Sequence, residues 1–196
     1  SVEVLRARAA LATGELETAE RFLKHALTLQ PEHAEALWAE GLLAERRSEA
    51  RVARRAYAAA VKANGYRVRA RLDFSRLLTR LGDYAAGHQQ LTSVLALQEQ
   101  NPVALAARAR ARVELQRKDA RKDLAALRDL GLRDRAKLLE ARQAMLAGHW
   151  LRASTLLAAL PKAWVDSNPE ARLWRAEVAA RRGRRPQARA AFKALT

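Results

Sequence analysis

The sequence has 196 residues, 49% of them hydrophobic, so the chain is long enough and apolar enough to bury a substantial core. Its 37 basic side chains exceed its 21 acidic ones, and the net charge of +16 favours an anionic partner over a basic one. The absence of cysteine excludes disulfides, thiol catalysis and Cys-ligated zinc, and no apolar run is long enough to span a membrane.

Small residues recur at intervals of 34 from the start of the chain, at Ala7, Gly41, Ser75 and Ala109. Three further columns share this interval: Ala19, Ala53 and Gly87; Leu23, Tyr57 and Leu91; and Ala26, Ala60 and Val94. Spacings of three and four residues place such positions on one face of a helix. Each repeat therefore predicts two helices joined by a turn, which in residues 34–65 falls at Arg47 and Ser48.

The later repeats follow the same pattern with small changes. The fourth fits if its internal turn loses one residue, with Ala109, Ala120, Leu124 and Leu127 on the stripe. The fifth has Ala141, Gly148, Trp150, Ala153 and Leu157, and the sixth has Ala176, Gly183, Ala188 and Phe192 after an insertion at 161–168. Asn101-Pro102, Asn168-Pro169 and Pro186 predict helix starts. We therefore expect an all-α protein of six helix pairs, or twelve helices.

These positions resemble tetratricopeptide repeats, most clearly in repeats one to three, where Gly82-Asp83-Tyr84 also matches the family pattern. A pentatricopeptide array, with a period of 35, fits the small-residue columns less well. The resemblance implies a right-handed α-solenoid over residues 1–196, as a single domain with first helices along a concave groove. Because the sequence lacks an initiator Met and begins within a helix-like pattern, we expect it to be a piece of a longer protein.

In this geometry, positions two, five, nine, twelve and thirteen of each first helix face the groove. Four of the six ninth positions are Arg, which predicts a ladder of guanidinium groups suited to an acidic segment. The predicted groove residues are Arg8, Trp38, Leu42, Arg46, Arg76, Arg80, Arg110 and Arg142. The alternatives are a solvated Arg-rich face and an Arg content set by codon use.

Trp38 is predicted to lie in this groove between Arg8 and Arg76 as an anchor for a partner, with Leu42 beside it for an apolar contact. The alternative is that Trp38 packs against the adjacent repeat. Trp174 is a weaker candidate of the same kind, whereas Trp150 is expected in the core and Trp164 in the inserted connector.

A second set of basic residues lies where first helices turn into second helices. This predicted basic rim comprises Arg47, Arg51, Arg117, Lys118, Arg121, Lys122, Arg182, Arg184 and Arg185. Such an edge is suited to phosphates or anionic lipid, although runs of charge are commonly only solvated.

Catalysis is not indicated. The four histidines lie in different repeats without a second ligand at helical spacing, and the sequence has neither a Gly-rich phosphate loop nor a nucleophile elbow. The match to a chaperone-type carboxylate clamp is also poor, because Asp73 stands where that resemblance requires Arg. We expect no cofactor, no metal and no enzyme activity in this chain.

The sequence therefore predicts a protein-interaction scaffold whose Arg-lined groove binds an acidic peptide or protein segment. The alternative is direct binding of an anionic polymer, either acidic exopolysaccharide or nucleic acid, and the lack of interleaved aromatic residues disfavours nucleic acid. The Ala/Arg-rich repeats are similar to those of bacterial envelope and secretion assemblies, including scaffolds for exopolysaccharide export. That likeness favours the bacterial periplasm over the cytoplasm; the oligomeric state stays open.

Overall fold

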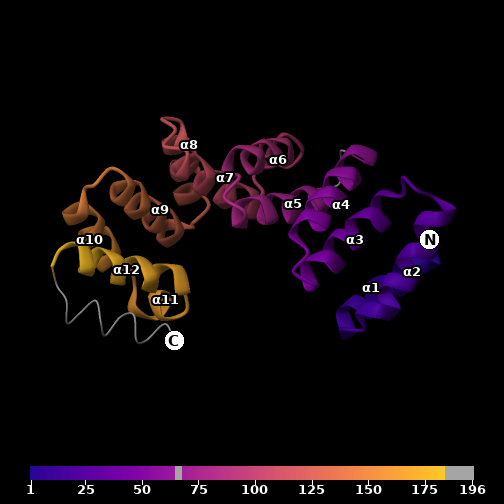
Figure 1. Ribbon diagram of the computed structural model, residues 1–196. Coiled ribbons are helices and arrows are strands. Elements are labelled where there is room, and N and C mark those ends of the chain that lie inside the picture. The colour runs from indigo at the N-terminus through magenta and orange to yellow at the C-terminus, as the bar shows by residue number, and fades with distance from the viewer. Residues whose placement is uncertain (65–67, 184–196) are drawn as a thin grey trace. The chain divides into compact units, whose positions relative to one another are not determined.

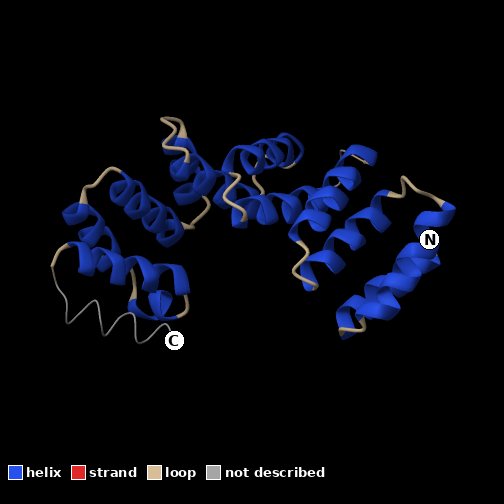
Figure 2. Cartoon of the chain, viewed as in Figure 1, coloured by secondary structure: helices blue, strands red, loops and turns tan. Residues whose placement is uncertain are grey.

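The computed structural model describes residues 1–64 and 68–183, and within these ranges every regular element is a helix (Figures 1 and 2). Contacts divide the chain into two compact units, Ser1–Glu99 and Gln100–Thr196. The extent of the domain, predicted as one solenoid over residues 1–196, stays a prediction. None of the described helices is long and apolar enough to cross a membrane.

The first unit consists of three helix pairs in chain order. Its helices are α1 (Val2–Thr13), α2 (Leu16–Leu29), α3 (Ala34–Arg46), α4 (Ala50–Ala63), α5 (Val68–Arg80) and α6 (Tyr84–Leu97). Each helix packs on its partner in the pair, and α1 also contacts α3. The predicted columns form the core, since Leu23, Tyr57 and Leu91 are buried together with the small residues that face them.

The second unit continues the pattern with two full pairs and the first helix of a third. Its described helices are α7 (Pro102–Glu114), α8 (Ala120–Asp129), α9 (Arg133–Leu146), α10 (Trp150–Ala158), α11 (Lys162–Asp166) and α12 (Pro169–Arg181). Asn101 and Asn168 begin α7 and α12 as predicted, because their side chains accept hydrogen bonds from the amides of Ala104 (2.9 Å) and Ala171 (3.1 Å).

Two details differ from the sequence prediction. The insertion at 161–168, expected as a connector, contains the short helix α11, whose Val165 is buried in the core of the second unit. The predicted shorter turn of repeat four is wrong, because α8 begins only at Ala120 and residues 115–119 stay outside both helices. Repeat four is shortened in its second helix instead, since α8 has 10 residues where α6 has 14. Pro186, Ala188 and Phe192 lie outside the described residues.

The three tryptophans of the second unit pack against one hydrophobic cluster. Trp174 is buried in it, whereas Trp150, expected in the core, and Trp164 are only partly buried at its edge. The guanidinium of Arg181 lies 5.4 Å from the ring of Trp150, and that of Arg142 lies 5.5 Å from the ring of Trp174. Cations at this distance stabilise an aromatic face that is not fully covered by apolar atoms.

Candidate functional site

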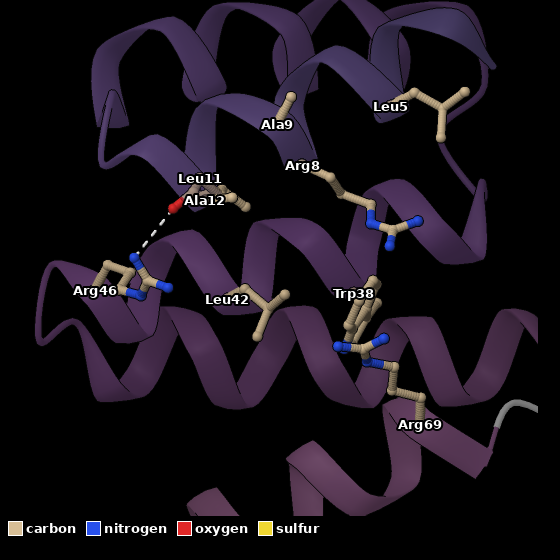
Figure 3. Close-up of a pocket in the computed structure, with 9 residues that line it drawn as sticks. All are labelled: Leu5, Arg8, Ala9, Leu11, Ala12, Trp38, Leu42, Arg46 and Arg69. Atoms are coloured by element: carbon tan, nitrogen blue, oxygen red, sulfur yellow. Dashed lines mark hydrogen bonds between the residues drawn. The ribbon is translucent and has the colours of Figure 1, made fainter.

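The first helices of repeats one to three enclose a hollow of about 440 Å³ (Figure 3). We call it the α1/α3/α5 hollow; its lining residues are Leu5, Arg8, Ala9, Leu11, Ala12, Trp38, Leu42, Arg46 and Arg69. Four predicted groove residues, Arg8, Trp38, Leu42 and Arg46, thus share one cavity. Three of the nine lining residues are Arg, and none of the nine is acidic. The volume lies within the range of about 300–1,000 Å³ that ligand pockets occupy.

Trp38 forms one wall of the hollow but is only 4% exposed, so it packs against the adjacent repeat. Its indole Nε1 donates a hydrogen bond to Asp73 Oδ2 (2.9 Å) on α5. The guanidinium groups of Arg8 and Arg69 lie 5.5 and 5.1 Å from its ring, a cation–π arrangement. The second arginine beside Trp38 is therefore Arg69, where the sequence suggested Arg76.

Leu42 and Arg46 complete the hollow one and two turns after Trp38 on α3 (Figure 3). Leu42 is half-buried and leaves apolar surface open to the cavity. Arg46 is exposed and donates from Nη1 to the carbonyl of Leu11 (3.1 Å), in the last turn of α1 where carbonyls lack helical partners. Among the described residues this is the one hydrogen bond of the Arg46 side chain, and it holds the guanidinium at the hollow.

Charge in the hollow is only partly compensated within the protein. Arg8 pairs with Glu35 at 3.0 Å. Within residues 1–64 and 68–183, neither Arg46 nor Arg69 has a carboxylate partner. Because the lining is apolar apart from these cations, the hollow presents positive charge around an aliphatic floor.

Arg76 and Arg80, also predicted for the groove, are bound to an acidic residue of the preceding repeat. Arg76 Nη2 lies 3.2 Å from Glu45 Oε2, Arg80 pairs with the other oxygen of Glu45, and Arg76 also pairs with Asp73 at 3.1 Å. Partial burial lowers the pKa of Arg76, but the carboxylates of Asp73 and Glu45 outweigh it and raise that pKa above the ordinary arginine value. These two arginines therefore join repeats two and three.

Glu45 also accepts a hydrogen bond from the hydroxyl of Tyr57 (2.9 Å), a residue whose side chain is fully buried. Burial, reinforced by this bond to Glu45, raises the pKa of Tyr57 far above its ordinary value. The hydroxyl stays protonated and donates, so Glu45 connects the core of repeat two to the arginines of repeat three.

In the second unit both predicted groove arginines are paired. Arg142 binds Glu114 through Nε (2.9 Å) and Nη2 (3.1 Å), a two-pronged contact. Arg110 pairs with Glu170 on α12. The predicted ladder therefore consists mainly of ion pairs between repeats, and uncompensated cations remain at the α1/α3/α5 hollow.

The predicted basic rim is divided between paired and solvated residues. Arg47 pairs with Glu20 at 2.8 Å, Arg117 pairs with Asp119 at 3.0 Å, and Arg182 donates to the hydroxyl of Ser154 at 2.8 Å. The side chains of Arg51, Lys118, Arg121 and Lys122 are exposed. Arg184 and Arg185 lie outside the described residues.

Sequence reasoning missed three polar residues that organise these sites. Arg69 occupies the second position of repeat three, one of the positions expected to face the groove, so the register contained the signal. Asp73, set aside as a poor clamp residue, orients the Trp38 indole. Asp123 is buried in the second unit and accepts from Arg108 (2.8 Å) and Arg112 (2.8 Å); the signal was its position three residues after Ala120 and four before Leu127, on the same helix face.

Several solved structures with a similar arrangement of helices are tetratricopeptide-repeat proteins. A tetratricopeptide repeat protein from Parabacteroides merdae superposes with a TM-score of 0.81 at 19% identity, covering 97% of this chain and 76% of its own. PilW, a type IV pilus biogenesis factor, gives 0.73 at 16% identity, covering 99% and 90%. YrrB, a protein with an unusual peptide-binding site, gives 0.70 at 17% identity, covering 80% and 81%.

No protein-family model and no curated protein sequence matches the chain. The structural likeness, together with the helix pairs and their buried columns, nevertheless defines the fold. The chain has the tetratricopeptide-repeat fold, an all-α array of helical repeats, as the 34-residue register predicts.

Proposed function

We propose that this chain is a non-catalytic scaffold that binds an acidic segment of another protein in the α1/α3/α5 hollow. The observation that carries the proposal is the composition of the hollow, which combines Arg8, Arg46 and Arg69 with an aliphatic and aromatic lining and no acidic residue among those described. Guanidinium groups bind carboxylates through parallel hydrogen bonds, and an apolar cavity selects an apolar side chain. YrrB, which has a similar fold and is described as having an unusual peptide-binding site, adds support for this class of function.

The arrangement along α3 favours a particular order of contacts. Leu42 lies between Trp38 and Arg46 in the hollow (Figure 3). An apolar side chain of the partner would contact Leu42, while acidic residues on either side of it would reach Arg69 at one end and Arg46 at the other. We therefore expect an acidic–apolar–acidic sequence in the bound segment.

Direct binding of an acidic polysaccharide or nucleic acid has less support. A polymer needs an extended row of available cations, whereas Arg76, Arg80, Arg110 and Arg142 are each paired with a carboxylate of this chain. The exposed basic rim residues have no aromatic side chains among them for base stacking.

Binding of a blocked Glu-Glu-Leu-Glu-Glu peptide to the full chain, measured by calorimetry, tests the proposal. Arg46→Gln and Arg69→Gln should each weaken binding by about tenfold, which is about 1.4 kcal/mol. Arg51→Gln removes the same charge from an exposed rim position and should change affinity less than twofold. A peptide with Gln in place of every Glu should bind much more weakly; equal binding of the two peptides would refute the proposal.

A salt titration separates the two candidate functions. The affinity for a peptide bound by two or three arginines should fall only gradually as the salt concentration rises, because part of the binding is apolar. Alginate or single-stranded nucleic acid held by many cations would show a steep dependence. Tighter binding of either polymer than of the peptide at physiological salt would favour the polymer.

A further inference from the structure

Two arginines of the second unit meet at one carboxylate. Arg110 Nη1 on α7 lies 2.5 Å from Glu170 Oε1 on α12, and Arg135 Nη1 on α9 lies 3.5 Å from Glu170 Oε2. Glu170 is the one described carboxylate that pairs with either arginine. Two positive charges thus share one negative charge, and within the described part of the chain one positive charge has no counterion.

The hydrogen-bonding capacity of Arg110 is also incompletely used. Its Nε is covered by protein atoms and has no hydrogen-bond partner among residues 1–64 and 68–183. Three other arginines of this unit bind carboxylates side-on through both Nε and Nη2: Arg142 to Glu114, Arg108 to Asp123, and Arg117 to Asp119. Arg110 contacts Glu170 through Nη1 instead, so the Nε edge that these other arginines use for a carboxylate has no acceptor in Arg110.

The site is partly removed from water, which strengthens its preference for an anion. The side chains of Arg110, Arg135 and Glu170 are 29%, 31% and 20% exposed. Burial holds the pKa of Arg135 below the ordinary arginine value; Glu170 opposes this, and the nearby charge of Arg110 adds to it. An added anion would stabilise both guanidinium groups, and the exposed parts of the two side chains give it access.

We propose that Arg110 and Arg135 form a carboxylate-binding site that Glu170 occupies as an internal ligand, and that an acidic side chain of a partner binds the two guanidinium groups in competition with Glu170. A single carboxylate matches the one uncompensated charge, and guanidinium groups bind carboxylates by charge-assisted hydrogen bonds. The site shares no residue with the α1/α3/α5 hollow. It therefore adds a second point of contact to the proposed function and does not depend on the first.

Removing the internal ligand provides the test. In the full chain, Glu170→Gln keeps the shape of residue 170 but removes its charge, and should tighten binding of a blocked Glu-Glu-Gly-Glu-Glu peptide roughly three- to tenfold. The Nε–Hε resonance of Arg110 should shift during the titration as a carboxylate binds the same guanidinium group. Adding Arg135→Gln to Glu170→Gln should abolish the gain. Arg135→Lys keeps the charge but loses the planar fork, and should abolish most of it.

Glu177→Gln, two turns along the same helix, is the matched control, because it makes the same change in net charge at a residue that pairs with neither Arg110 nor Arg135 among the described residues. An equal gain from Glu177→Gln would show a general charge effect and overturn the proposal. Unchanged or weaker binding by Glu170→Gln in a folded chain would also overturn it, as would binding of inorganic phosphate without binding of the peptide.

The two proposals can fail separately. The Glu-Glu-Gly-Glu-Glu peptide lacks the apolar residue expected in the hollow, and the gain from Glu170→Gln should persist when Arg46 and Arg69 are both changed to Gln. Loss of that gain in the hollow variants would assign the peptide to the hollow and overturn the site at Arg110 and Arg135.

Discussion

Gly41 on α3 packs tightly against the ring of Tyr57 on α4, and Gly41→Ala should disrupt this contact. A Cβ at residue 41 would lie 2.5 Å from both Cδ1 and Cε1 of Tyr57. Carbon atoms pack at about 3.5–4.0 Å, so the ring or the helix would have to move by about 1 Å. Tyr57 is fully buried and its hydroxyl is bound to Glu45, so the ring has no space into which it can withdraw.

Two opposing terms determine the magnitude. Exchange of Gly for Ala within a helix favours folding by about 1 kcal/mol, whereas overpacking a dense core costs about 1–3 kcal/mol. Because the ring is held on all sides, we expect the upper part of that range and a net loss of about 1–2 kcal/mol in the free energy of unfolding. Urea denaturation followed by circular dichroism measures it as a lower midpoint with an unchanged slope.

Gly87→Ala is the matched control. Its Cβ would meet Thr79 Oγ1 at 3.4 Å and the Ser75 carbonyl at 3.5 Å, which are close to ordinary contacts. With no ring to displace, the helix-forming preference of Ala should prevail, and the variant should be as stable as the parent or more stable by up to about 1 kcal/mol.

A compensating change tests the packing argument directly. The equivalent pair in repeat one is Ala7 with Leu23, both buried. Tyr57→Leu in the Gly41→Ala background rebuilds that pair, so the double variant should be more stable than the sum of the two single changes predicts, by about 1–3 kcal/mol. Additive effects, or a Gly41→Ala variant at least as stable as the parent, would refute the reasoning.

Three further changes should alter stability in stated directions. Asp123→Ala leaves Arg108 and Arg112 partly buried without their shared carboxylate, and should cost about 3–5 kcal/mol in urea denaturation; a loss below about 1 kcal/mol would contradict a structural role for the cluster. Glu40→Gln should stabilise the fold at pH 7. Burial raises the pKa of Glu40 above its usual 4.5, an effect that Arg55 opposes, so the folded state binds a proton more readily than the unfolded state. The stability that protonated Glu40 contributes is therefore lost as pH rises through its folded pKa. The melting temperatures of the variant and the parent should converge below about pH 4. A difference in melting temperature that does not change with pH would contradict this. Asn101→Ala removes the N-cap of α7 and should lower the unfolding free energy by about 1 kcal/mol, whereas Asn101→Asp, which keeps an accepting oxygen, should not.

The sequence by itself determined the repeat architecture. A solenoid buries each helix pair against its neighbours, so the same buried position recurs at the repeat length and small residues appear wherever helix axes approach closely. The pairing of Gly41 with Tyr57, and the Asn-Pro helix starts, follow from such local and periodic rules. The α11 helix interrupts the repeat pattern. Its helical structure could not be predicted from positions that recur from one repeat to the next.

The tertiary structure decided which arginines are available. Helical spacing places Arg8, Arg46, Arg76 and Arg110 on similar faces, but it does not say which carboxylate of another repeat lies within reach of each guanidinium. The structure identifies these partners: Arg76 pairs with Glu45, and Arg110 pairs with Glu170. Arg46 lines the α1/α3/α5 hollow, to which residues of three helices contribute. Charge pairing across repeats depends on distances of a few ångströms between side chains far apart in the chain, and periodicity carries no information about them.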